Sequence, residues 1–282
     1  MWLIRYPFPP SAIRCESCLV SQTLDLISVT AIKSARAGKL IGRRVVWLDQ
    51  TVSTNETAKE LAGRRAPEGT IVLADEQSAG KGRLGRTWTS PPGASILLSV
   101  VLRPRLSILT NLTMMASLAA TRAIEGSTGL AASIKWPNDV LVAGKKVGGI
   151  LIEGQLSGEM PRFAVVGIGL NVNFDVRTAP EIPETATSIA LELKHEFPRQ
   201  ALLLALLDEL EVAYTALKAG AAILPEWRAR LETLGRWVKV ATSVGLIEEG
   251  RAEDVDELGR LLLRHADGSL VALSEGDVSL RY

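Results

Sequence analysis

From about residue 44 onward, apolar and polar positions follow one another in runs that have the lengths of strands and helices. Apolar runs rich in β-branched residues predict strands at 45–48, 70–74, 95–102 and 163–170. Apolar positions at helical spacing predict helices at 109–125, 200–219 and 224–231. Residues 1–40 carry only a weak helical pattern, near 21–37.

Shorter signals complete this pattern. Ser53-Thr54-Asn55-Glu56 predicts a capping box that opens a helix with Ala58, Leu61 and Ala62 on one side. Residues 133–153 predict three strands joined by a Pro-Asn-Asp turn and a Gly-Lys turn. After Gly235, short β runs predict a small β-barrel-like module, at 237–241, 260–264, 270–273 and 278–281.

Composition excludes several classes of protein. The 282 residues are 47% hydrophobic and carry a net charge of +1, which gives no strong field for nucleic acid or a membrane surface. Residues 1–46 are basic, with seven Lys or Arg against two acids. Cys15 and Cys18 are the only cysteines, which argues against a disulfide scaffold and against zinc. With no signal-peptide pattern and no apolar run near the ~18 residues of a membrane span, we expect a cytoplasmic protein.

The most distinctive stretch is a glycine-rich basic loop that begins after Gln77. Gly80, Gly82 and Gly85 alternate with the cations Lys81, Arg83 and Arg86, and no Asp or Glu occurs between Gln77 and Ile124. Glycines let the backbone approach a ligand, and a loop of one charge suits a phosphate or a carboxylate. Trp88 and the prolines at 91 and 92 fix the end of this loop.

Three familiar glycine motifs do not fit this loop. The dinucleotide fingerprint needs a helix at the glycines and an acid about 20 residues later, and the two prolines and the acid-free stretch exclude both. A Walker P-loop needs Ser or Thr after its lysine, whereas Gly82 follows Lys81. The His-Arg-Asp and Asp-Phe-Gly motifs of protein kinases are absent.

Five motifs, taken together and in order, resemble the biotin protein ligases, the biotin–[acetyl-CoA-carboxylase] ligases of bacteria. They are Ser53-Thr54-Asn55, the loop from Gln77 to Trp88, Lys135-Trp136-Pro137-Asn138-Asp139, Lys146-Val147-Gly148-Gly149-Ile150-Leu151 and Gly167-Ile168-Gly169-Leu170-Asn171. The resemblance covers about residues 43–282. It implies an α+β fold, in which helices flank a mixed central sheet like that of class II aminoacyl-tRNA synthetases and an SH3-like barrel follows. The implied domains are an N-terminal extension at 1–40, a catalytic domain at 41–233 and the SH3-like domain at 234–282.

The resemblance also implies the reaction. MgATP activates the carboxylate of biotin as biotinyl-5′-AMP, and a lysine of a biotin carboxyl carrier protein then attacks this anhydride. The implied catalytic residues are Lys146, Arg83 and Lys81. The implied biotin-binding residues are Ser53, Thr54, Asn55, Gln77, Gly80, Lys81, Arg83, Lys146, Gly149 and Gly167. The implied nucleotide-binding residues are Arg83, Arg86, Trp88, Asn138, Lys146 and Asn171, and no side chain is assigned to the metal.

The chain departs from the family at two points. Lys81 stands where the family most often has Arg, so a single point charge replaces a bidentate fork. The C-terminal module of the family commonly lends a basic residue to the nucleotide site, and the sequence does not place one, since Glu253 stands near where it is expected and Arg251 is the nearest cation.

Two alternatives remain open at this point. A lipoate or octanoate ligase has a related fold and chemistry, although the related octanoyltransferases use a cysteine nucleophile, and Cys15 and Cys18 lie outside the catalytic region. A biotin-operon repressor with a truncated DNA-binding segment is the other alternative. A winged helix-turn-helix needs more chain than residues 1–40, so we expect no specific DNA binding. We also expect no membrane partner and a homodimer that forms through the sheet edge.

Overall fold

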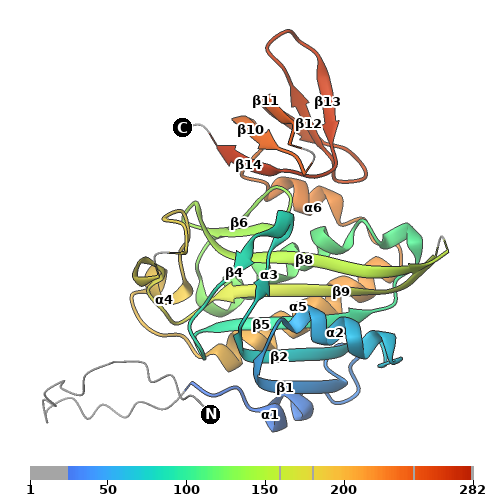
Figure 1. Ribbon diagram of the computed structural model, residues 1–282, viewed down its shortest axis with the longest axis vertical. Helices are drawn as coiled ribbons and strands as arrows, with labels where there is room; N and C mark the ends of the chain where they lie inside the picture. Colours follow the sequence, from blue (N-terminus) through green and yellow to red (C-terminus); the bar gives the residue numbers. More distant parts are fainter. Residues whose placement is uncertain (1–24, 159, 180, 244, 281–282) are drawn as a thin grey trace, which may run out of the picture.

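The fold is built on a seven-stranded mixed sheet, whose strands lie one above another in Figure 1, from β1 at the bottom to β6 at the top. The computed structural model describes residues 25–158, 160–179, 181–243 and 245–280. The strand order is β1 (Arg44–Thr51), β2 (Thr70–Gln77), β5 (Ser95–Leu102), β9 (Met160–Asn171), β8 (Lys145–Ser157), β7 (Asp139–Val142) and β6 (Ala132–Lys135). β1 and β2 are parallel, and every other neighbouring pair in this sheet is antiparallel. The mixed sheet expected from the sequence is therefore confirmed.

Helices cover both faces of the sheet, and the alternation of side chains in β2 shows how. Ile71 and Leu73 belong to the large core cluster with α3 (Leu112–Thr128) and α5 (Arg199–Lys218). Val72 points to the other face and packs with Ala58 and Ala62 of α2 (Thr54–Gly63). A strand buried on both faces has no polar side to alternate with, which is why β5 is a continuous apolar run.

The C-terminal module is a five-stranded antiparallel sheet that stands at one end of the molecule (Figure 1). Its order is β13 (Leu270–Leu273), β12 (Leu261–Arg264), β11 (Ile247–Val255), β10 (Trp237–Ala241) and β14 (Asp277–Leu280). The sequence predicted four of these strands and missed β11. Charged residues occupy most of β11 and leave only Gly250, Ala252 and Val255 buried, so its apolar signal is weak.

Two tryptophans join the module to the main sheet. Trp136 and Trp227 are each 1% exposed and share a core with Val238, Ala252 and Leu263 of the module. Trp136 Nε1 donates to the backbone oxygen of Gly259 at 2.9 Å. Trp227 belongs to α6 (Leu224–Ala229), which lies between the module and α3. This core fixes the module beside the turn between β6 and β7.

The capping box predicted at residues 53–56 is wrong. Ser53 is the N-cap of α2 but makes no side-chain capping bond, and Glu56 pairs with Lys59 and Lys81 instead. The side chain of Gln77, at the end of β2, does the capping: its Oε1 accepts from the backbone N–H of Thr54 at 2.8 Å. The helix therefore begins where a distant strand ends, and this ties the two motifs together.

Residues 25–40 pack against the main sheet and α5. This segment contains α1 (Val29–Ala35). α4 (Ile189–Leu193) lies just past the end of β9, where the backbone N–H of Ala190 donates to Val172 O at 2.9 Å. Arg36 is 2% exposed and pairs with Asp208 and Glu211 of α5, while Arg199 is 1% exposed and pairs with Asp25 and Asp75. Residues 1–24, on which most of the expected N-terminal extension falls, lie outside the described residues. No helix in the described part of the chain is long and apolar enough to cross a membrane.

Candidate active site

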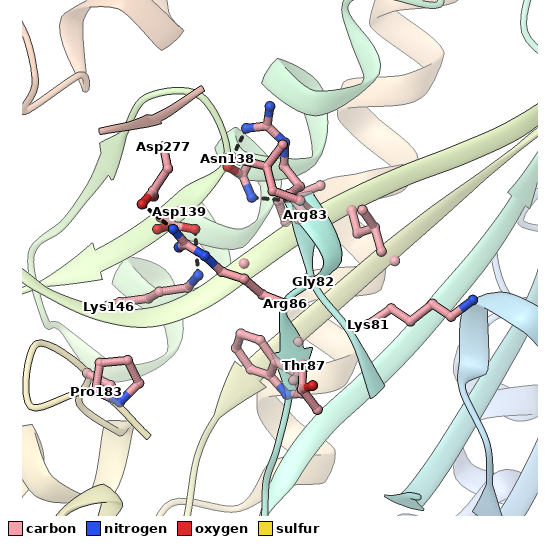
Figure 2. A pocket seen from close by; sticks show the side chains of 18 of the residues that line it. Lys81, Gly82, Arg83, Arg86, Thr87, Asn138, Asp139, Lys146, Pro183 and Asp277 are labelled. Atoms are coloured by element: carbon pink, nitrogen blue, oxygen red, sulfur yellow. Dashed lines mark hydrogen bonds and ion pairs between the residues drawn. The ribbon is translucent and has the colours of Figure 1, made fainter. Parts of the chain in front are cut away.

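A cavity of about 460 Å³ lies where the basic loop, the main sheet and the C-terminal module meet. Its walls come from the start of α2, residues 81–89 of the loop, the β6–β7 turn, β8, β9, the segment 181–186 and residues 276–279 of the module. Figure 2 shows the cationic part of this cavity. The cavity has a polar end at the buried residues Thr54 and Asn55, here called the closed end, and a charged end near Lys146, and glycines line the space between them.

Three glycines of β8 and β9 line this space, and side chains of the protein lie close to each of them. A Cβ at Gly167 would lie 2.3 Å from Asn55 Oδ1, and one at Gly169 would lie 2.6 Å from Trp88 Cε2. At Gly149, a Cβ would lie 3.4 Å from both Trp88 Cζ3 and Lys146 Cε. Gly167 and Gly169 thus let the side chains of Asn55 and Trp88 approach the backbone of β9. The indole of Trp88 lies against this glycine surface.

Four polar side chains meet at the closed end. Gln77 Oε1 accepts from the Thr54 backbone N–H at 2.8 Å and lies 3.0 Å from Thr54 Oγ1. Ser99 Oγ lies 2.8 Å from Thr54 Oγ1 and 2.6 Å from Asn55 Oδ1. Thr54, Asn55 and Ser99 are each less than 5% exposed, so these contacts are shielded from water. The sequence did not identify Ser99, which looks like an ordinary position of an apolar strand.

A row of alternating charges connects the closed end to the basic loop. Asn55 Nδ2 donates to Glu153 at 2.8 Å, Lys59 bridges Glu153 at 2.6 Å and Glu56 at 2.8 Å, and Glu56 also pairs with Lys81. Partial burial acts to lower the pKa of Lys59, but its hydrogen bonds to Glu153 and Glu56 outweigh this and raise it. Hydrogen bonds from Lys59 and Lys81 lower the pKa of Glu56. Figure 2 shows Lys81 directed away from Lys146 and Arg86.

At the charged end, Asp139 holds two lysines. Its Oδ1 lies 2.7 Å from Lys146 Nζ, and its Oδ2 lies 3.7 Å from Lys135 Nζ. Lys146 Nζ also lies 5.7 Å from the centroid of the Trp88 ring, within range of a cation–π contact. Asp139 is 7% exposed. The ammonium of Lys146 is therefore fixed at the junction between the glycine lining and the charged end.

The arginines of the loop are held by other elements. The loop consists of β3 (Gly80–Lys81), a 3-10 turn (Arg83–Gly85) and β4 (Thr87–Trp88). Arg83 Nη1 donates to Asn138 Oδ1 at 3.0 Å, and burial lowers the pKa of Arg83. Arg86 pairs with Asp277 of β14, which raises the pKa of Arg86 (Figure 2). The C-terminal module thus contacts the loop through an acid.

Comparison with known proteins agrees with this geometry. Residues 47–171 match the biotin/lipoate A/B protein ligase family, and residues 233–281 match the biotin protein ligase C terminal domain. The biotin--[acetyl-CoA-carboxylase] ligase of Mycobacterium tuberculosis is 36% identical over 258 residues, which are 85% of this chain and 92% of that protein. The bifunctional ligase/repressor BirA of Bacillus subtilis is 33% identical over 268 residues, which are 91% of this chain and 80% of that protein.

The solved structures agree as well. The biotin protein ligase from Aquifex aeolicus in complex with biotin and ATP is 30% identical, with a TM-score of 0.69 over 85% of this chain and 99% of that one.

This chain belongs to the biotin protein ligase family.

As a biotin protein ligase, the chain brings almost all of its predicted site residues to one cavity. The lining includes Ser53, Thr54, Asn55, Gln77, Lys81, Arg83, Arg86, Trp88, Asn138, Lys146, Gly149, Gly167 and Asn171. Gly80 is not part of the lining, and a Cβ there would lie 2.3 Å from Trp88 O and 2.7 Å from Gln77 Nε2. Which of these residues bind biotin and which bind nucleotide stays a prediction.

Some residues of the site have no counterpart in the sequence prediction. Asp139 stood in a recognised motif but received no role, and Ser99, Glu153 and Asp277 were missed. Asp277 is 191 residues from its partner Arg86, so no local pattern could have connected them. The basic residue expected from the module is not among Gly276, Asp277, Val278 and Ser279, the described residues of the module that line the cavity.

Two buried polar atoms near the cavity have no partner among the described residues. They are Trp88 Nε1 and Asn171 Oδ1. Asn171 is 4% exposed, and its Nδ2 donates to the backbone oxygen of Thr187 at 3.0 Å. Since buried polar atoms are almost always hydrogen-bonded, these two atoms are suited to contact a ligand.

Proposed function

We propose that this biotin protein ligase activates biotin with ATP as biotinyl-5′-AMP and transfers the biotinyl group to a lysine of the carrier protein of acetyl-CoA carboxylase. One observation carries the proposal: a single cavity joins a polar closed end, at Thr54 and Gln77, to a cationic end, at Lys146 and Arg83. The first end suits the ureido ring of biotin, and the second suits its carboxylate beside a phosphate. The relatives named for biotin–carboxylase ligation support the choice of carrier.

The cations explain how two anions can react in this site. The carboxylate of biotin attacks the α-phosphorus of ATP, so that a C–O–P bond forms and pyrophosphate leaves with the electrons of the broken P–O bond. Both partners are negative, so fixed positive charge must offset their repulsion in the transition state. Asp139 holds the Lys146 ammonium in place before the ligands arrive, which avoids a cost of reorganisation during the reaction.

The transfer step needs little from the protein beyond access and orientation. The neutral ε-amine of the carrier lysine attacks the carbonyl carbon of the anhydride, a C–N bond forms, the C–O bond to the phosphate breaks, and AMP leaves. The nitrogen loses one proton to solvent. The side chains that balanced charge in the first step also stabilise the departing AMP.

The carboxylates of the cavity are too few to hold Mg²⁺ by themselves, so the ion would be held mainly by the phosphates of ATP. The described residues contain no group of three or more His, Cys, Asp or Glu that could hold a metal. Asp139 already binds Lys146 and Lys135, and Asp277 already binds Arg86. Mg²⁺ commonly takes one or two carboxylates plus substrate phosphates, so Asp139 or Asp277 would supplement the phosphates. The ion would neutralise phosphate charge.

Biotin-dependent exchange of pyrophosphate into ATP tests the activation step. We expect exchange with biotin and none with lipoate or octanoate, because the closed end presents polar groups that only a ureido ring can pair. Exchange driven by lipoate or octanoate, but not by biotin, would refute the proposal and favour the related lipoate ligases.

For the quaternary structure, we propose a homodimer that uses the β1 edge of the main sheet. Residues 230–232 cover β6 through backbone bonds from Ile134 N to Arg230 O and from Glu232 N to Ile134 O, each 2.9 Å. In the described chain, β1 is the other edge and its ladder runs only to β2. Sedimentation of the wild type and of a variant with Pro at Val46, in the middle of β1, tests this. A monomeric wild type, or a dimer that the proline does not weaken, would contradict it.

A further inference from the structure

We propose that Lys135 supplies the surplus positive charge that lets Lys146 hold the anionic group of the ligand. Lys135 ends β6 and lines the cavity, but it is not among the residues that the family resemblance assigned to catalysis or binding. It acts through Asp139, the carboxylate that it shares with Lys146, and is thus a positioning residue. The inference rests on the proposed function in one respect, namely that the anionic group is the carboxylate of biotin.

The first step is that most cations of the cavity already have an acid of their own. Three of the five Lys and Arg side chains in the lining each lie against one carboxylate, in the pairs Lys81 with Glu56, Arg86 with Asp277 and Lys146 with Asp139. The other two donate to neutral oxygens, Arg83 to Asn138 Oδ1 and Lys135 to Val278 O. A paired cation attracts a further anion only weakly, because its acid repels that anion. Arg83 and Lys135 are therefore the cations whose charge is left over for a ligand.

The second step concerns the carboxylate of Asp139, which two lysines share. Its Oδ1 lies 2.7 Å from Lys146 Nζ, and its Oδ2 lies 3.7 Å from Lys135 Nζ. Asp139 is 7% exposed, so water screens its charge less than it would at the surface. Alone with this carboxylate, Lys146 would form a pair without net charge. With Lys135 present, the two ammonium groups and the one carboxylate together carry a single positive charge, which matches one anionic group of a ligand.

The fold holds Lys135 beside Asp139 from two sides. Lys135 and Asp139 stand directly opposite each other in the antiparallel β6–β7 ladder, so their side chains lie on the same face of the sheet. From the other side, Lys135 Nζ donates to Val278 O of the C-terminal module at 3.1 Å. The side chain of Lys135 is 23% exposed, so its position is defined mainly by these neighbours. The module therefore fixes where the surplus charge lies.

The same surplus charge suits both the substrate and the intermediate of the proposed reaction. The carboxylate of biotin brings one negative charge to Lys146. In biotinyl-AMP this carboxylate has become a neutral acyl group, and the phosphoryl group joined to it carries one negative charge. A fixed single positive charge can balance either anion without rearrangement of the protein. Loss of Lys135 should therefore weaken the hold on the anionic group and leave the contacts with the uncharged part of the ligand intact.

Binding of biotin and of biotinamide to the full chain, measured by calorimetry without nucleotide, tests the inference. Biotinamide carries a neutral amide in place of the carboxylate, so it reports every contact except the attraction of charges. Lys135→Gln removes the charge and keeps an N–H donor for Val278 O. We expect its Kd for biotin to rise roughly tenfold, with Kd for biotinamide within about twofold of wild type. Lys135→Arg keeps the charge and should bind both ligands within about threefold of wild type.

Two further variants show whether the effect is local and whether it passes through Asp139. Lys145→Gln, the matched control, removes the same charge at an exposed position outside the cavity lining, where solvent screens it. Its Kd for biotin should stay within about twofold of wild type. Adding Asp139→Asn to Lys135→Gln leaves Lys146 without an opposing carboxylate and restores the single positive charge. The double variant should therefore recover most of the affinity for biotin that Lys135→Gln loses.

Three results would overturn the inference. The first is a Kd for biotin in Lys135→Gln that equals that of wild type. The second is an equal loss of affinity for biotin and for biotinamide, which would show that Lys135 only supports the shape of the cavity. The third is a double variant that binds biotin no better than Lys135→Gln. If wild type binds neither ligand, the proposed function fails instead.

Discussion

At the scale of single residues, the cations of the cavity have different partners and therefore different tasks. Lys146 is fixed by Asp139 beside the glycine lining, and Arg83 is held by Asn138. Lys81, the position where the family most often has Arg, is paired with Glu56 on α2. We therefore expect Lys146 to be the cation that meets the reacting carboxylate and phosphate.

Lys146→Ala should slow adenylate formation and leave transfer intact. Removing one preorganised charge from a transition state costs on the order of 3 kcal/mol, or roughly a hundredfold in rate. Single-turnover formation of biotinyl-AMP measures the first step, and labelling of the carrier from supplied biotinyl-AMP measures the second. The neighbouring Lys145→Ala, at an exposed position, is the matched control and should match wild type. An unchanged rate of adenylation in Lys146→Ala would show that Lys146 takes no part in this step.

At the scale of elements, the loop at residues 80–88 is a small hairpin that crosses the cavity. Its cations are held by three different elements, through Glu56 on α2, Asn138 in the β6–β7 turn and Asp277 on β14. Fixing a glycine-rich segment costs roughly 1–2 kcal/mol per residue, so we expect this loop to be mobile without ligand and to close when anions arrive. A closed loop would exclude water from the anhydride and keep it from diffusing away.

Arg83→Gly should release biotinyl-AMP into solution while still making it. The change removes the contact with Asn138 and adds a fourth glycine to the loop. Mixed with serum albumin, biotin and ATP, the variant should label bystander lysines that wild type leaves unlabelled. Equal and negligible labelling by both enzymes, with adenylation intact in the variant, would exclude Arg83 as the residue that keeps the loop closed.

The sequence predicted the elements whose signal is local and missed those defined by distant partners. β5 and α3 were found because long apolar runs and helical spacing exist within one segment. β11 was missed because its charges conceal the strand period, and the capping box failed because Gln77, from another strand, took over its task. Family motifs located most of the cavity lining, but not its walls at residues 181–186 and 276–279. They could not supply Asp277 or the contact of Lys135 with Val278 O, since both depend on how the folded chain brings remote residues together.

At the scale of the whole molecule, the C-terminal module forms part of the cavity wall. Lys135 Nζ donates to Val278 O at 3.1 Å, and Asp277 pairs with Arg86 of the loop. The shared core around Trp136 and Trp227 keeps these contacts in register. Closure of the loop over nucleotide is therefore expected to depend on the module.

Asp277→Asn should weaken the hold of the module on the loop without unfolding either. The Arg86 side chain is 57% exposed, so solvent screens the pair and the effect is modest. We expect KM for ATP to rise about twofold to fivefold, with the midpoint of thermal unfolding unchanged. Glu253→Gln, which breaks an exposed pair with Arg264 elsewhere in the module, is the control. Equal KM values for ATP in the two variants would show that the contact between Asp277 and Arg86 does not affect nucleotide binding.

The basic segment at residues 1–46 should not give sequence-specific DNA binding. It has seven Lys or Arg against two acids, but specific readout also needs a recognition helix supported by a second helix, and the sequence pattern of this segment is weak. A gel shift with a biotin-operon operator at physiological salt should show no specific complex. A specific complex that is lost when residues 1–24 are deleted would contradict this.

The central claim is that one cavity joins biotin to ATP and passes the biotinyl group to a carrier. Mass spectrometry of a biotin carboxyl carrier domain after incubation with the full chain, MgATP and an equal mixture of biotin, lipoate and octanoate tests it most directly. The account predicts one biotinyl group on one lysine of the carrier and neither of the other acids. A carrier that acquires lipoyl or octanoyl groups, or that stays unmodified while biotin-driven exchange proceeds, would contradict it.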